Sequence, residues 1–171
     1  TNNKELADKV RLLGNYGSEE RYIHDIPGVN SRMDPIQASF LCIKLKYLDL
    51  WNERRKTIAE SYLDELKDLG LILPIVEEFN SPVWHLFCIR SSNRDNLRQE
   101  LLNKGVETLI HYPIPPYAQK AYQHLEYENT SFPVTSKIAG ELLSLPVGPF
   151  MEDYEVNKVI DSLKCILPIQ N

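Results

Sequence analysis

The stretch that decides the fold runs from Asp34 to Leu50 and reads D-P-I-Q-A-S-F-L-C-I-K-L-K-Y-L-D-L. It predicts a helix start, because an aspartate cap, a proline at the first helical position and a glutamine three residues after the cap all favour one. Apolar residues then recur every three or four positions and predict one apolar stripe along the helix. These residues are Ile36, Phe40, Ile43, Tyr47 and Leu50.

The same periodicity continues past Leu50 and stops at Gly70. It predicts a single helix over residues 34–69, about 54 Å long at ~1.5 Å per residue. Because this length exceeds the width of a small domain, we expect the helix to bend near its polar residues 52–56 and to link two bodies. Arg54 and Arg55 are expected on its solvated face.

Shorter elements are expected on both sides of this helix. A helix capped by Asn2 or Asn3 and stopped by Gly14 precedes it, followed by an exposed polar loop over residues 15–30. After Gly70 the apolar pattern changes to short runs, which predict a small α+β domain. Its expected strands are residues 71–76, 83–89 and 106–111, and its expected helices are residues 92–104, 117–125, 134–143 and 153–167.

Length and charge narrow the function classes. The 171 residues carry 19 Lys and Arg against 24 Asp and Glu, a net charge of −5. Nucleic-acid-binding domains usually carry a basic surface, so no nucleic-acid partner is expected. No apolar run approaches the ~20 residues of a membrane-spanning helix, so no membrane association is expected. The chain begins with Thr1 rather than Met, and we interpret it as a piece of a longer protein.

Cysteine, glycine and histidine spacings point away from several kinds of site. The three cysteines, Cys42, Cys88 and Cys165, include no C-x-x-C pair. This pattern favours buried thiols in a reducing cytoplasm over a disulfide framework or a zinc site. The seven glycines form no G-x-G pair and the four histidines lack H-E-x-x-H spacing. Neither a dinucleotide fingerprint nor a metal site is therefore predicted, and no catalytic residue is nominated.

Residues 28–32, G-V-N-S-R, form the first candidate binding segment. They place an amide, a hydroxyl and a guanidinium immediately before the helix that starts at Asp34. Free backbone N–H groups and the helix dipole favour an anion at such a position, so Asn30 and Arg32 could hold a phosphate or a carboxylate. The alternative is a loop whose polar side chains satisfy only local backbone groups. The residue types alone leave both interpretations open.

Residues 111–117, H-Y-P-I-P-P-Y, form the second candidate segment. The three prolines hold the backbone extended, so a rigid loop could present His111, Tyr112 and Tyr117 to a cleft. Histidine titrates near neutral pH, and tyrosine offers a hydroxyl and a flat face for a sugar. The alternative is a connector with surface rings. His85 lies in an expected strand among apolar neighbours and is predicted to be a hydrogen-bonded core histidine.

Blocks of sequence spread over the chain carry a specific resemblance. The longest covers residues 28–62, from G-V-N-S-R-M-D-P-I-Q to E-R-R-K-T-I-A-E-S-Y. The others are T-N-N-K-E-L-A-D-K-V-R at residues 1–11, W-H-L-F-C-I-R at residues 84–90, H-Y-P-I-P-P at residues 111–116 and L-S-L-P at residues 143–146. Together they resemble, in order, the C-terminal half of the DegT/DnrJ/EryC1/StrS family of sugar aminotransferases.

The resemblance implies an α/β protein with the aspartate-aminotransferase-like fold of pyridoxal-phosphate-dependent transferases (fold type I). Such an enzyme moves an amino group, usually from glutamate, to a nucleotide-linked keto-sugar in deoxyamino sugar biosynthesis. A cytoplasmic homodimer with active sites at the subunit interface is implied. Residues 1–33 would end the large cofactor-binding domain, residues 34–70 would form the long linking helix, and residues 71–171 would form the small C-terminal α+β domain.

The resemblance also implies roles for the two candidate segments. Asn30, with Arg32 beside it, would reach the phosphate of the pyridoxal 5'-phosphate held by the partner subunit. His111, Tyr112 and Tyr117 would lie near the sugar-nucleotide site.

The family's Schiff-base lysine would precede Thr1, in the missing N-terminal half of the same protein. A chain without this amine is expected to be inactive by itself. Two other interpretations stay open. The whole protein could be a dehydrating family member in which histidine replaces the lysine, or the chain could be a non-catalytic module that binds a sugar nucleotide or a partner.

Overall fold

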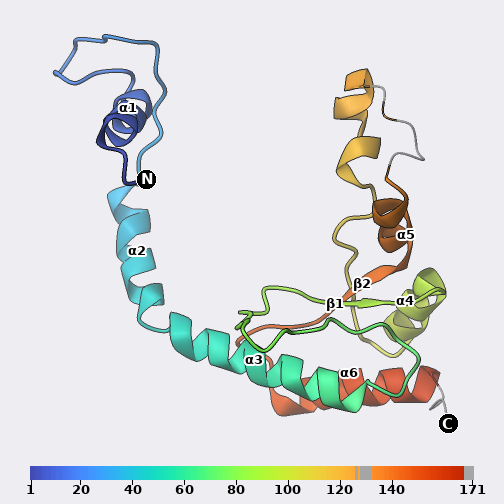
Figure 1. Ribbon diagram of the computed structural model, residues 1–171. Coiled ribbons are helices and arrows are strands. Elements are labelled where there is room, and N and C mark those ends of the chain that lie inside the picture. The colour runs from blue at the N-terminus through green and yellow to red at the C-terminus, as the bar shows by residue number, and fades with distance from the viewer. Residues whose placement is uncertain (126, 128–131, 168–171) are drawn as a thin grey trace. The chain divides into compact units, whose positions relative to one another are not determined.

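The computed structural model describes residues 1–125, 127 and 132–167, and the chain forms two compact units, Thr1–Tyr47 and Leu48–Asn171 (Figure 1). Along the part of the chain that is described, no helix has the length and apolar character needed to cross a membrane.

The first unit begins with α1 (Lys4–Gly14), which confirms the predicted first helix. Asn3 caps it, because its side-chain oxygen accepts a hydrogen bond from the Leu6 amide at 3.1 Å. The following loop folds back on the helix end and brings Gly28 against Gly17. A Cβ on Gly28 would lie 2.2 Å from the Gly17 nitrogen, so only glycine fits this approach.

The predicted long helix is wrong as a single element. It is divided into α2 (Pro35–Leu45) and α3 (Leu48–Glu65), and the interruption lies at residues 46–47 rather than 52–56. There the backbone tightens: the amides of Lys46 and Tyr47 donate to carbonyl oxygens three residues back, at 3.2 and 3.0 Å. Asp34 takes an extended N-cap conformation but makes no side-chain capping bond. The apolar stripe of α2 is exposed, and none of its residues is buried.

The second unit is built on a two-stranded antiparallel sheet, β1 (Phe87–Arg90) paired with β2 (Leu142–Leu145). Phe87 lies opposite Leu145 and Ile89 opposite Leu143, so all four side chains share one face. Each is 3% exposed or less, and they join one core with α3 and α6 (Asp153–Ile166). Figure 1 shows α3 and α6 side by side along the strands. The predicted last helix is thereby confirmed.

Two isolated bridges extend this ladder on both sides. Ile72 pairs with Arg90, and Leu109 pairs with Ser144. The predicted strands at residues 71–76 and 106–111 are thus reduced to single bridges. Helix α4 (Arg94–Asn103) confirms the predicted amphipathic helix.

Other predictions for this unit need correction. Residues 117–125 form 3-10 turns, η1 (Pro116–Ala118) and η2 (Lys120–Leu125). The predicted helix over residues 134–143 ends early, as α5 (Pro133–Glu141), because the next four residues pair with β1 as strand β2. Strand β1 starts only at Phe87, since the left-handed backbone of Trp84 (φ 49°) breaks the alternation before it. His85 is therefore exposed and is not a core histidine.

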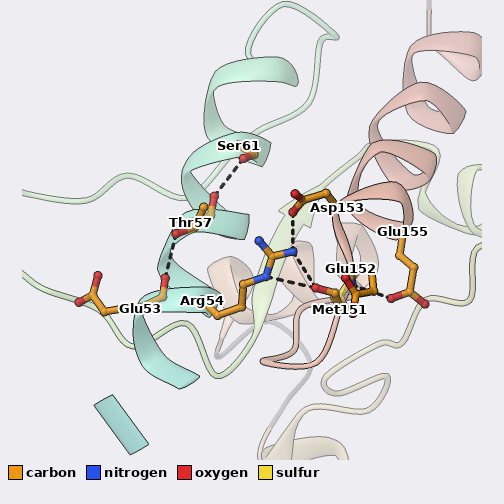
Figure 2. A network of polar contacts seen from close by, with 8 residues as sticks. All are labelled: Glu53, Arg54, Thr57, Ser61, Met151, Glu152, Asp153 and Glu155. Carbon is orange, nitrogen blue, oxygen red and sulfur yellow. Dashed lines mark hydrogen bonds and ion pairs between the residues drawn. The ribbon is translucent and has the colours of Figure 1, made fainter. Parts of the chain in front are cut away.

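The prediction that Arg54 and Arg55 lie on a solvated face is wrong, because both side chains hydrogen-bond to other parts of the second unit. Arg54 on α3 donates to the carbonyl oxygen of Met151 from Nε (3.1 Å) and Nη2 (2.7 Å), as Figure 2 shows. It also donates to the Asp153 carboxylate at 2.8 Å, at the first residue of α6. Arg55 makes longer contacts, 3.4 and 3.5 Å, with the carbonyls of Trp84 and His85. Helix α3 is thus tied to both the start of α6 and the approach to β1.

The prediction of buried thiols is wrong. Cys42 and Cys165 are exposed and Cys88 is partly buried. No two of them are bonded to each other, so all three are free thiols.

Candidate functional site

Asn30 and Arg32 are held against the end of α1 within the first unit. Asn30 forms an antiparallel β-bridge with Asn15, the residue that follows α1. The amides on either side of it, those of Val29 and Ser31, donate to the carbonyl oxygens of residues 13 and 14, each at 2.8 Å. The backbone at Asn30 is therefore fixed from both sides.

The side chains of this segment form a small polar cluster. Arg32 donates from Nε to the Asn30 side-chain oxygen at 3.1 Å and from Nη1 to the Asn15 side-chain oxygen at 3.2 Å. Its guanidinium carbon lies 5.6 Å from the centroid of the Tyr16 ring. Among the described residues Arg32 enters no ion pair, so no carboxylate neutralises its charge.

This geometry supports part of each interpretation of residues 28–32. Arg32 does bond groups of its own unit, as the local alternative expected, but these groups are side chains rather than the backbone. However, Asn30 is exposed and its side-chain oxygen is occupied by Arg32, so the NH₂ group is the end of the amide left to donate. The contacts lie at the C-terminal end of α1, where the helix dipole is negative, so Arg32 rather than a dipole supplies the positive charge. An exposed amide donor beside an unneutralised guanidinium suits a phosphate.

His111 is turned toward the sheet of the second unit. Its Nδ1 lies 2.9 Å from the Ser144 hydroxyl, which in turn lies 3.3 Å from the Cys88 sulfur on the neighbouring strand. Tyr112 follows with its ring edge-on to the imidazole, at a centroid distance of 5.6 Å, and is 71% exposed. The structure thus separates two neighbours: His111 is anchored, and Tyr112 is presented outward.

Tyr117 at the far end of the same loop is also anchored. Its hydroxyl lies 2.5 Å from the Ser136 hydroxyl on α5, and its ring packs on Phe132 at a centroid distance of 5.0 Å. Because the Ser136 hydroxyl donates to the Phe132 carbonyl at 2.8 Å, the Tyr117 hydroxyl is the donor to Ser136. Only one of the three predicted residues, Tyr112, therefore carries a largely exposed side chain.

Two cavities border this loop. One of about 480 Å³ is lined by His85, Arg98, Glu107, Thr108, His111 and Ser144, among others. The other, of about 400 Å³, is aromatic and lined by Tyr117, Tyr122, Tyr127 and Phe132, among others. The apolar pattern predicted His85 as a core residue rather than a cavity-lining one, and periodicity singled out neither Arg98 nor Tyr122. The high density of tyrosine between residues 112 and 127 was the available signal for the aromatic cavity.

The two predicted groups belong to different compact units, with Asn30 and Arg32 in the first and the loop of residues 111–117 in the second. Within the described ranges, no three His, Cys, Asp or Glu side chains gather as a metal site would require.

Comparison with known proteins shows the family to which the chain belongs. Residues 1–164 match the DegT/DnrJ/EryC1/StrS aminotransferase family, and the chain belongs to it. The chain is 46% identical over 165 residues to the erythromycin biosynthesis sensory transduction protein EryC1 of Saccharopolyspora erythraea, covering 96% of this chain and 45% of that protein. It is 44% identical to the dTDP-3-amino-3,6-dideoxy-alpha-D-galactopyranose transaminase of Aneurinibacillus thermoaerophilus, covering 95% and 44%.

Solved structures show the same likeness. The crystal structure of S. venezuelae DesV in complex with a ketimine intermediate matches with a TM-score of 0.94 and 41% identity, over 100% of this chain and 46% of that one. NtdA from Bacillus subtilis with bound cofactor PMP matches with a TM-score of 0.88 and 31% identity, over 97% and 40%. These matches confirm the predicted family and the predicted α/β fold class. The chain spans less than half the length of these relatives.

Proposed function

We propose that these 171 residues are the C-terminal part of a pyridoxal-phosphate-dependent aminotransferase that moves an amino group from glutamate to a nucleotide-linked keto-sugar. The observation that carries the proposal is the likeness to DesV along the whole chain, at 41% identity. The names of the related dTDP-sugar transaminases favour a nucleotide sugar as the amino acceptor.

The proposed domain assignment rests on the resemblance to the family. Residues 1–33 end the large cofactor-binding domain, residues 34–70 link the domains, and residues 71–171 form the small domain. The enzyme is a cytoplasmic homodimer whose remaining half precedes this chain. The exposed apolar side chains of α2 support this assembly, because Ile36, Phe40 and Ile43 are each at least 56% exposed and need a covering surface.

In this proposal Asn30 and Arg32 hold the phosphate of pyridoxal 5'-phosphate in the partner subunit. When bound, that cofactor stabilises the negative charge that develops at the carbon from which the amino group is transferred. The fit rests on two observations: Arg32 occupies the side-chain oxygen of the exposed Asn30 and leaves its NH₂ group to donate, and no described carboxylate neutralises the Arg32 charge. Asn30 donates to a phosphate oxygen, while Arg32 occupies the amide oxygen and adds positive charge.

The loop of residues 111–117 contributes to the sugar-nucleotide site. Tyr112 offers its exposed ring and hydroxyl to the substrate, and His111 and Tyr117 stand at the two ends of the loop. The aromatic cavity beside Tyr117 gives this side of the site flat apolar surfaces.

The test uses the full-length enzyme purified with its cofactor. Glutamate alone should shift the visible absorbance of bound pyridoxal phosphate to that of pyridoxamine phosphate, and a dTDP-linked keto-sugar should reverse the shift and yield an amino sugar. Absence of any change with glutamate would contradict the proposal. Release of water from the sugar without amination would identify the dehydrating alternative instead.

A further inference from the structure

The two ends of the loop of residues 111–117 are tied to one continuous piece of the second unit. Ser144 on β2 holds the beginning of the loop. Its amide donates to the Leu109 carbonyl at 2.8 Å, its carbonyl accepts from the Leu109 amide at 3.2 Å, and its hydroxyl lies 2.9 Å from His111 Nδ1. Ser144 is only 4% exposed, so this anchor is shielded from water.

Ser136 on α5 holds the end of the loop. It accepts a hydrogen bond from the Tyr117 hydroxyl at 2.5 Å, and its own proton is committed to the Phe132 carbonyl. The Gln119 side chain, just after the loop, donates to the Ile114 carbonyl at 2.9 Å and so ties the middle of the loop to the residues that follow it.

The piece that carries both serines is itself well fixed. Helix α5 runs directly into β2, which is paired with β1. At the junction Glu141 accepts two hydrogen bonds from Arg90, at 2.6 and 3.1 Å, and both side chains are largely buried. Arg94 donates to the Ala139 and Leu142 carbonyls across the same junction. The two serines therefore belong to one continuous segment that is hydrogen-bonded to its surroundings on both sides of the junction.

Little freedom is left between the two anchors. Pro113, Pro115 and Pro116 each fix one backbone angle, so the loop cannot easily relax once its ends are held. Tyr112 lies between the anchored His111 and the first proline. Its direction is therefore set from outside the loop, by Ser144 and Ser136.

We infer that Ser144 and Ser136 are positioning residues for nucleotide-sugar binding: they act through His111 and Tyr117 to preorganise the loop that presents Tyr112. This inference rests on the proposed function. Neither serine needs to contact the substrate. A loop ordered before binding loses less conformational entropy on binding, so loss of an anchor weakens substrate binding more than it slows the chemistry.

The experiment compares Ser144→Ala and Ser136→Ala in the full-length holoenzyme, with Ser162→Ala as the matched control. Ser162 is also a buried serine, 8% exposed, but lies on α6. Each anchor variant should raise the KM for the nucleotide sugar about three- to tenfold, as expected for one lost hydrogen bond. The rate of the half-reaction with glutamate, which uses no sugar, should stay within about twofold, and Ser136→Thr, which retains a hydroxyl, should restore the KM.

Different results bear on different claims. Equal losses in both half-reactions, or an unchanged KM in both anchor variants, would overturn the positioning role. If Ser144→Ala does not fold because the site is buried, Ser136→Ala decides alone. A wild-type enzyme that does not react with glutamate would instead overturn the proposed function, and the substrate role of the two serines with it.

Discussion

Arg54 on α3 donates two hydrogen bonds, from Nε and Nη2, to the carbonyl oxygen of Met151, which lies 97 residues further along the chain. The same guanidinium group reaches Asp153 at the start of α6 (Figure 2). The carbonyl contact matters more than the ion pair, since the Arg54 side chain is 26% exposed but that of Asp153 is 86% exposed and its charge is screened by water.

Arg54→Ala should lower the free energy of unfolding by about 1.5–3 kcal/mol, the usual value for hydrogen bonds that involve a charged group. Denaturant unfolding of the full-length protein measures it. Arg55→Ala is the control, because the neighbouring arginine makes only long contacts of 3.4 and 3.5 Å and should cost less. Equal losses in the two variants would contradict the role given to Arg54.

Tyr62→Phe should make stability at high pH less dependent on pH. Tyr62 is fully buried and donates to the Pro146 carbonyl at 2.9 Å. Burial raises the pKa of Tyr62 above its usual value of 10.0, so the unfolded chain loses this proton at a lower pH than the folded chain. The stability that Tyr62 contributes is present below pH ~10 and falls as the pH rises above it, by about 1.4 kcal/mol per pH unit.

The measurement is the unfolding free energy of both proteins between pH 9 and 11. The difference between them should shrink as the pH rises, since only the wild type carries this buried phenol. A constant difference over this range would show that Tyr62 ionises as readily in the folded chain as in the unfolded one.

Asn30→Ala should weaken retention of pyridoxal phosphate by about 1.5–3 kcal/mol, which corresponds to roughly 10- to 150-fold in the dissociation constant. The reason is the loss of one hydrogen bond to a charged phosphate. Equilibrium dialysis of the full-length enzyme gives the constant directly. Asn157→Ala, an exposed asparagine on α6, serves as the control, and an unchanged constant for Asn30→Ala would remove Asn30 from the cofactor site.

Gly28→Ala should also weaken cofactor retention, although residue 28 is not placed in contact with the phosphate. A Cβ there would lie 2.2 Å from the Gly17 nitrogen and 2.7 Å from the Leu13 carbonyl oxygen. The loop must open to admit it, and Asn30 shifts with the loop. Gly140→Ala is the matched control, because a Cβ at Gly140 meets nothing within 4 Å. Similar cofactor affinities in both variants would contradict the dependence of Asn30 on this close approach.

The 171-residue chain alone should not turn over glutamate in the presence of pyridoxal phosphate, because it contains no lysine in the context expected for the covalent attachment of the cofactor. Absorbance spectra and a glutamate assay on the purified chain test this, with the full-length enzyme as the positive control. Turnover by the isolated chain would show that the amine is present here after all.

The candidate site shows where sequence reasoning reached its limit. The N-S-R block led to Asn30, and the H-Y-P block led to the loop of residues 111–117. Neither block predicted which side chains point inward. His111 and Tyr112 are neighbours in the chain, yet one is bound to Ser144 and the other is exposed, and this depends on a strand that lies more than thirty residues later.

By itself the sequence determined α1, α4 and α6, whose apolar periodicity and end signals act within a few residues and need no distant partner. It also determined the family, through short blocks kept in order along the chain. Only the tertiary structure decided that Leu142–Leu145 is a strand, that His85 is exposed and that Arg54 is hydrogen-bonded to Met151. The strand and the Arg54 contacts depend on partners far away in sequence, and the exposure of His85 follows from the left-handed backbone of Trp84. Apolar periodicity carries no record of either.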